Sequence, residues 1–236
     1  MAKRHKKLAR LKKIEAGKNK LSLEHIDSLE LLEIIKNDLP NPVIYDVGAN
    51  VGTWAKLALA IFPGAEIQCF EPLPDHAKKC VELFYNYPNI KIHTVALGAT
   101  NYTDNINVVS LTDASSLLEL SEDCKEKYHL SVTGKAEITV KKLDDFITDY
   151  NLNKPDVIKL DIQGFELEAL KGASETLKNT KYVLTEVSFT EFYKGQAYFS
   201  DIVSYLSTYG FELCALSVST RTGKLLEQTD VLFKKR

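Results

Sequence analysis

Two segments of the chain carry residues that could bind a nucleoside. The first, Asp46–Trp54, contains Gly48 and Gly52 four positions apart, and glycines at the end of a strand let the backbone approach a ligand closely. In the second, Glu71 precedes Pro72 and lies 19 residues beyond Gly52. A carboxylate at that distance along the chain can accept hydrogen bonds from both hydroxyls of a ribose. Together the two segments predict an adenosine-containing ligand.

The glycine spacing narrows the choice of ligand. A dinucleotide site needs the pattern G-x-G-x-x-G and a nucleoside triphosphate site needs a Walker lysine, and the segment around Asn50 has neither. A ligand without phosphates, S-adenosylmethionine, fits these residues better. Asp46 could then meet the ammonium group of the ligand, directly or through water, or it could cap the loop. Thr53 could contact the ligand or, more simply, cap the following helix.

Two carboxylates further along the chain could act on a substrate. Asp161 and Glu186 each stand at the end of an apolar run that predicts a strand. There, either side chain could accept the proton of a substrate hydroxyl. Asp161 could equally face the sulfonium group of the cofactor or cap its loop, and Glu186 could bind the acceptor. Glu166 is the first residue of a predicted helix, where the helix dipole stabilises a carboxylate. Because two carboxylates alone are a weak metal signal and the histidines and cysteines show no ligand spacing, we expect no metal site.

Strand-like and helix-like stretches alternate along the chain and define the elements that must position these residues. Strands are predicted at residues 43–47, 66–70, 90–97, 157–161, 182–187, 211–218 and 230–234, and helices at 21–39, 53–62, 75–85, 143–150, 166–178 and 196–208. This alternation predicts an α/β fold with a doubly wound, mostly parallel sheet that binds its ligand at the carboxyl ends of the strands. The turn at 221–224 predicts an antiparallel final pair.

The alternation breaks at about residues 98–142, where extended pieces at 105–110 and 137–141 flank a stretch rich in serine and aspartate. We interpret this stretch as a lobe inserted into a single domain of residues 21–236. With 236 residues, of which 44% are hydrophobic, the chain is long enough to bury a sizeable core. No run approaches the roughly 18 apolar residues that span a membrane.

Residues 1–20 form a basic arm that contrasts with the rest of the chain. The arm holds nine lysines and arginines and one acidic residue, which leaves 21 basic and 31 acidic residues in the body. Leu8, Leu11 and Ile14 recur in it at helical spacing. Either the arm is a solvated terminus or it contacts an anionic membrane surface or polymer. The acidic body argues against a nucleic-acid partner.

The four cysteines are far apart, and no apolar segment follows the basic start as a secretory signal would require. We therefore expect reduced thiols and a cytoplasmic protein that can lie at the membrane surface through its arm.

Six segments in order resemble the FkbM-type methyltransferases. They are Val43–Gly52, Phe70–Pro72, Val95–Gly98, Ala114–Leu118, Val140–Phe146 and Ile158–Glu166. The resemblance implies a class I methyltransferase with a Rossmann-like sheet of seven strands, the last antiparallel. It also implies methyl transfer from S-adenosylmethionine, usually to a hydroxyl of a sugar, glycan or polyketide-type acceptor. Within these segments it assigns Pro72, Ala96 and Leu97 to the cofactor.

Ser115 and Ser116 belong to the lobe and either close over the cofactor or begin a helix.

One position departs from the family. Its segment K-x-D-x-E-G has a glutamate where this chain has Gln163, and an amide cannot ionise. A role for that carboxylate would pass to Asp161, or the enzyme would depend on positioning alone. Two alternatives follow: a binding module that has lost catalysis, and an RNA methyltransferase guided by the arm. Against the second, the chain lacks the Asn/Asp-Pro-Pro-Tyr/Phe signature of base methylation.

Overall fold

A computed structural model describes residues 11, 25–217, 220–222 and 224–236. The basic arm of residues 1–20 therefore lies outside the described residues, apart from Leu11. Leu11 is buried in the same hydrophobic cluster as helix α2 (His25–Asp38). Among the described residues, no helix is long and apolar enough to cross a membrane.

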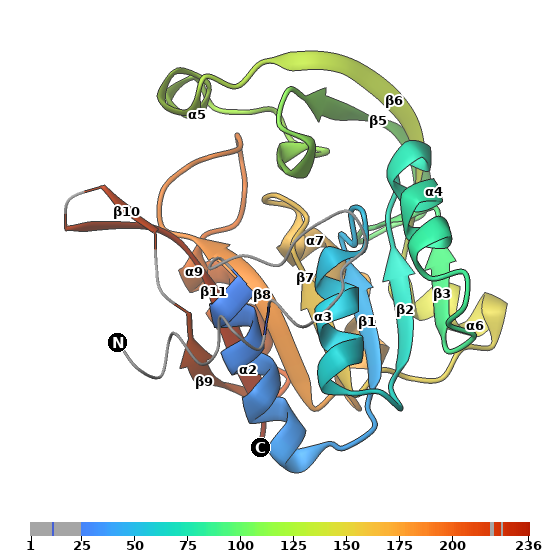
Figure 1. The fold of residues 1–236 in the computed structure, drawn as a ribbon. Helices are drawn as coiled ribbons and strands as arrows, with labels where there is room; N and C mark the ends of the chain where they lie inside the picture. Colours follow the sequence, from blue (N-terminus) through green and yellow to red (C-terminus); the bar gives the residue numbers. More distant parts are fainter. Residues whose placement is uncertain (1–10, 12–24, 218–219, 223) are drawn as a thin grey trace.

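A twisted main sheet forms the centre of the molecule (Figure 1). Its five parallel strands lie in the order β3-β2-β1-β7-β8. In chain order these strands are β1 (Val43–Val47), β2 (Glu66–Phe70), β3 (Ile90–His93), β7 (Val157–Leu160) and β8 (Tyr182–Ser188). Strand β11 (Leu225–Lys235) runs antiparallel to β8, and β9 (Phe211–Leu216) and the short β10 (Thr220–Thr222) both pair with β11. The predicted α/β class, the mostly parallel sheet and the antiparallel final strands are confirmed.

Side chains alternate between the two faces of the sheet, as the two-residue period of a strand requires. On β1, Ile44 packs into one hydrophobic cluster, whereas Tyr45 and Val47 pack into the other. Helices α2, α3 (Thr53–Ile61) and α4 (Pro74–Leu83) contribute to the first cluster. Helices α6 (Leu143–Tyr150), α7 (Glu166–Lys171), α8 (Ser174–Leu177) and α9 (Phe199–Ser207) contribute to the second. The sheet is therefore covered on both faces.

The strand predicted at 90–97 is divided in two. After β3, the backbone N–H of Val95 donates to the carbonyl oxygen of His93, and this tight turn ends the pairing with β2. The next residues, Ala96–Leu97, form β4, which pairs with β6 in a second, smaller sheet. The prediction of one continuous strand was therefore wrong, because a turn redirects the chain into the lobe.

The lobe consists of β4, β5 (Tyr102–Val109), the 3-10 helix η1 (Thr112–Ala114), α5 (Glu122–Tyr128) and β6 (Val132–Lys141). It extends over the carboxyl ends of the parallel strands (Figure 1). At its root, Gly98 lies so close to Gly172 that a Cβ on Gly172 would overlap the carbonyl oxygen of Gly98.

Near the outer end of the lobe, Ser121 Oγ donates to the carbonyl oxygen of Glu191, and Lys127 pairs with Glu227 of β11. The lobe is thus held at both ends.

Candidate active site

The loop between β1 and α3 requires glycine at two positions. Gly48 and Gly52 have φ angles of 82° and 86°, a region that favours glycine. A Cβ on Gly48 would overlap the carbonyl oxygen of Asp161, and one on Gly52 would meet the ring of Phe84 at 2.7 Å. Both glycines are therefore required by contacts within the chain. Only Gly48 also lines a pocket, so the predicted reason, close approach to a ligand, does not apply to Gly52.

Glu71 is held at one side of that pocket by two backbone groups. Its carboxylate accepts hydrogen bonds from the N–H groups of Asn50 and Leu73, each at 2.9 Å. Burial raises the pKa of Glu71, although both hydrogen bonds act in the opposite direction. His76 lies close, with Nδ1 3.8 Å from Glu71 Oε1. Each carboxylate oxygen can still accept a further hydrogen bond, which is what a ribose hydroxyl would need.

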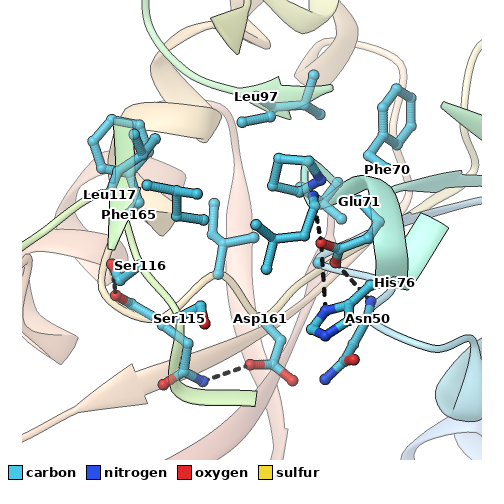
Figure 2. Close-up of a pocket in the computed structure, with 18 of the residues that line it drawn as sticks. Asn50, Phe70, Glu71, His76, Leu97, Ser115, Ser116, Leu117, Asp161 and Phe165 are labelled. Atoms are coloured by element: carbon cyan, nitrogen blue, oxygen red, sulfur yellow. Dashed lines mark hydrogen bonds and ion pairs between the residues drawn. The ribbon is translucent and has the colours of Figure 1, made fainter. Parts of the chain in front are cut away.

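The pocket lies between the strand ends and the lobe, and Figure 2 shows Glu71 and Asn50 facing Ser115, Leu117 and Phe165 across it. Nine residues predicted from the sequence line this pocket: Gly48, Asn50, Glu71, Pro72, Ala96, Leu97, Ser115, Ser116 and Asp161.

Eleven further residues line the pocket and were not predicted as site residues, most of them apolar: Val47, Phe70, Leu73, His76, Val95, Ile106, Asp113, Leu117, Ile162, Gln163 and Phe165. The pocket therefore combines a few polar groups with apolar walls, as small-molecule sites do.

Three residues predicted to bind the cofactor do not line the pocket. Asp46 is completely buried and forms an ion pair with Lys159, whose Nζ is 3.1 Å from Asp46 Oδ1. The ammonium group of Lys159 thus occupies the place beside Asp46 where the ammonium group of the ligand was predicted. Gly52 is the N-cap of α3 and Thr53 is its first residue, so the expected capping by Thr53 was wrong.

Lys159 joins the loop after β1 to the loop after β7. Its ammonium also lies 3.5 Å from Asp161 Oδ2 and donates to the carbonyl oxygen of Gly48 at 3.2 Å. Burial alone would lower the pKa of Lys159, but the carboxylates of Asp46 and Asp161 raise it overall. Lys159 was not predicted as a site residue, although a lysine within an apolar strand was an available signal.

Asp161 and Glu186 come together through a third side chain. The amide nitrogen of Gln163 donates to Asp161 Oδ1 at 3.0 Å and to Glu186 Oε2 at 3.2 Å. Asp161 and Gln163 line the pocket, whereas Glu186 does not. Burial, followed by the charge of Asp161, raises the pKa of Glu186 well above its ordinary value.

Glu166 holds the loop that carries Asp161 and Gln163. Its Oε1 accepts hydrogen bonds from the N–H groups of Ile162 at 2.9 Å and Gly164 at 3.2 Å. The side chain therefore serves its own loop rather than the pocket. Burial raises the pKa of Glu166 to about 7.

This raised pKa predicts that the protein loses stability as the pH rises from about 4.5, the ordinary value, to about 7. In that window the folded state binds the proton more tightly than the unfolded state does, so ionisation of Glu166 favours unfolding. We expect Glu166→Gln, which keeps the accepting oxygen, to raise the free energy of unfolding by about 3 kcal/mol at pH 8. At pH 4 the variant and the parent should be alike. Urea denaturation at both pH values measures this, and equal stability at pH 8 would contradict it.

The pocket fits a nucleoside ligand that also carries hydrogen-bond donors. Asn50 Oδ1 is buried and, within the described residues, has no hydrogen-bond partner. A buried acceptor without a donor is costly, so this oxygen is suited to a donor supplied by a ligand. With the carboxylate of Glu71 and the apolar walls nearby, the residues present fit S-adenosylmethionine, which has an ammonium group, a ribose and an adenine.

The fold and the pocket are those of a class I methyltransferase. Residues 46–213 match the methyltransferase FkbM domain. The chain belongs to the FkbM methyltransferase family.

Two curated relatives have named activities. The 2-O-methyltransferase NoeI of Sinorhizobium fredii is 32% identical over 183 residues, which cover 75% of this chain and 74% of that protein. The hexuronic acid methyltransferase AglP of Haloferax volcanii is 28% identical, with 66% of this chain and 59% of that protein covered.

Solved structures share the fold at lower identity. A crystal structure of methyltransferase FkbM from Methylobacillus flagellatus aligns with a TM-score of 0.55 and 18% identity over 82% of this chain. The alignment spans 44% of that longer protein. Magnesium protoporphyrin IX methyltransferase from Synechocystis, with bound S-adenosylmethionine, aligns with a TM-score of 0.50 and 14% identity over 97% of this chain and 90% of that one.

Proposed function

We propose that the protein uses S-adenosylmethionine to methylate a hydroxyl group of a sugar or glycan. The observation that carries the proposal is one pocket that holds Glu71, suited to a ribose, and Asp161, suited to a hydroxyl proton. The printed activities of the two curated relatives, a 2-O-methyltransferase and a hexuronic acid methyltransferase, support this choice of acceptor.

Different residues of the pocket would contact different parts of the cofactor. Glu71 would accept hydrogen bonds from the ribose hydroxyls, and Asn50 Oδ1 would accept one from the ammonium group. Apolar side chains, among them Leu97 and Phe165, would enclose the adenine. When bound, S-adenosylmethionine supplies an electrophilic methyl group. The chain contributes by holding the acceptor hydroxyl near it, which can account for much of the rate enhancement.

Asp161 is suited to take the proton of the acceptor hydroxyl. The side chain of Asp161 is 42% exposed and lines the pocket, so an acceptor hydroxyl can reach it. Asp161 would accept the proton and then release it to solvent. Glu186 lies on the other side of Gln163 and supports the same acceptor region.

Glu71→Ala should weaken the binding of S-adenosylmethionine by about 1.5–3 kcal/mol, the scale of hydrogen bonds to a charged group. This corresponds to a roughly 10- to 150-fold higher dissociation constant. Isothermal titration calorimetry on both proteins measures it, with circular dichroism as the check on folding. The loss of the carboxylate frees the N–H groups of Asn50 and Leu73, so a modest local effect on the loop is expected as well. An unchanged dissociation constant would remove Glu71 from the site.

The function is tested by incubating the full chain with S-adenosylmethionine labelled in its methyl group. The acceptor panel contains neutral hexoses, deoxyhexoses, hexuronic acids and oligosaccharides of each, with an unmodified RNA as the comparison. Mass spectrometry then locates the labelled methyl group. Label on a sugar hydroxyl supports the proposal. Label on RNA favours an RNA methyltransferase, and tight cofactor binding with no transfer to any acceptor favours a binding module.

A further inference from the structure

Gln163 uses its side-chain amide and its backbone carbonyl group inside the candidate active site. Its amide nitrogen donates to Asp161 and to Glu186, and its amide oxygen lies 2.8 Å from the hydroxyl of Tyr193. Its backbone carbonyl oxygen accepts from Ser116 Oγ at 2.7 Å. A glutamine that connects four separate segments in this way has a more specific role than filling space.

The chemistry of the neighbours fixes the orientation of the amide. Carboxylates accept hydrogen bonds, so the NH₂ group of Gln163 must face Asp161 and Glu186, one hydrogen for each. The amide oxygen then faces Tyr193, whose single hydroxyl hydrogen it shares with the carbonyl oxygen of Ala114 at 2.9 Å. A glutamate at position 163 could not donate to two carboxylates, and a hydrophobic residue could not donate to either.

The two carboxylates need such a donor because their surroundings are mostly acidic. The charges that face Glu186 are those of Asp161, Asp230 and Glu166, with Lys159 as the opposing cation. Asp230 is the direct partner of Glu186 in the pairing of β8 with β11. A neutral donor between Asp161 and Glu186 lets both lie close together and adds no charge.

Gln163 also connects these carboxylates to the lobe. Ser116 and Ala114 both belong to the lobe segment that borders the pocket, and each is tied to Gln163 directly or through Tyr193. The backbone at Gln163 has a φ angle of 58°, and that of Gly164 has a φ angle of 93°. Such conformations cost energy for residues other than glycine and persist where the surroundings hold them in place.

We propose that Gln163 is a positioning residue that holds Asp161 and Glu186 as one proton-accepting pair and joins this pair to the lobe. The inference rests on the proposed function. As the acceptor oxygen becomes methylated, its hydroxyl proton passes to the pair and then to solvent, so that the pair returns to its starting state. Gln163 itself exchanges no proton.

The test compares the parent with Gln163→Met and Gln163→Glu, which keep the length of the side chain. The first readout needs neither cofactor nor acceptor: carboxyl groups labelled with ¹³C are followed by NMR as the pH changes. The signal of Glu186 is identified by its loss in Glu186→Gln. We expect its titration midpoint to rise by about one pH unit in Gln163→Met, because the ionised form loses a hydrogen bond, and further in Gln163→Glu, which adds a charge.

The second readout is methyl transfer to the sugar that the acceptor panel identifies. In Gln163→Met we expect a kcat about 30-fold lower, with the dissociation constant for S-adenosylmethionine within about three-fold of the parent. In Gln163→Glu the acid limb of the kcat profile should move to higher pH. Tyr193→Phe, which leaves both carboxylate hydrogen bonds in place, should keep the parent's acid limb.

The outcomes separate this inference from the proposed function. If the parent binds no S-adenosylmethionine, the proposed function fails. In another outcome, the parent binds S-adenosylmethionine and methylates the sugar, while the substitutions at residue 163 change neither the titration midpoint of Glu186 nor the acid limb of the kcat profile. That result overturns the inference alone. A parent-like kcat in Gln163→Met would also overturn it.

Discussion

Replacing Lys159 by methionine is expected to lower the free energy of unfolding by about 3–5 kcal/mol. The change leaves the carboxylate of Asp46 completely buried with no cation beside it, and an unpaired buried charge is costly. It also removes the hydrogen bond to the carbonyl oxygen of Gly48, one of the ties between the β1–α3 loop and β7. Urea denaturation of parent and variant at pH 7 measures the loss.

The matched control adds Asp46→Asn to Lys159→Met. The double variant no longer buries a carboxylate without a counter-charge, so it should recover part of the lost stability. A loss below about 1 kcal/mol in the single variant, the scale of an exposed ion pair, would show that the pair is not the buried contact described above.

Asp161→Asn should separate binding from chemistry. Asparagine keeps the shape of the side chain and an oxygen for Gln163, so we expect the dissociation constant for S-adenosylmethionine to stay within about three-fold of the parent. It cannot accept a proton from the acceptor hydroxyl, so turnover should fall by a factor of about 100 or more. Calorimetry gives the first quantity, and the rate of S-adenosylhomocysteine formation with a sugar acceptor gives the second.

Glu186→Gln is the companion variant, because Glu186 contacts the same amide without lining the pocket. A smaller loss of turnover there would assign the proton to Asp161. Unchanged turnover in Asp161→Asn would instead leave that residue as a cap of its loop. A loss of cofactor affinity before any loss of turnover would place Asp161 beside the sulfonium group.

Strand order explains why much of the pocket could be predicted from the sequence. Val47 pairs with Phe70 on one side and with Leu160 on the other, so the residues that follow these strands must emerge together. Gly48, Glu71 and Asp161 are those residues. Short apolar runs separated by helices are enough to predict a parallel sheet, and parallel neighbours end at the same edge.

The contacts that depend on register or on the lobe could not be predicted in the same way. Lys159 meets Asp46 because β7 pairs with β1 in a register that places the two residues side by side, 113 positions apart in the chain. Leu117 reaches the pocket because the lobe folds back over the strand ends. No local sequence pattern encodes either contact, since each depends on how segments that are remote in the chain pack together.

The contact between Gly98 and Gly172 fixes one end of the lobe to the body. At this root the two backbones touch without a side chain between them, so a pivot there would have to separate packed main chain. Farther out, the lobe packs on the segment after β8: a backbone bridge joins Leu120 to Tyr193, Ser121 contacts Glu191, and apolar side chains of both segments share one buried cluster. The lobe is therefore fixed to the body at both ends, by touching main chain at the root and by a backbone bridge and buried apolar side chains at the outer end.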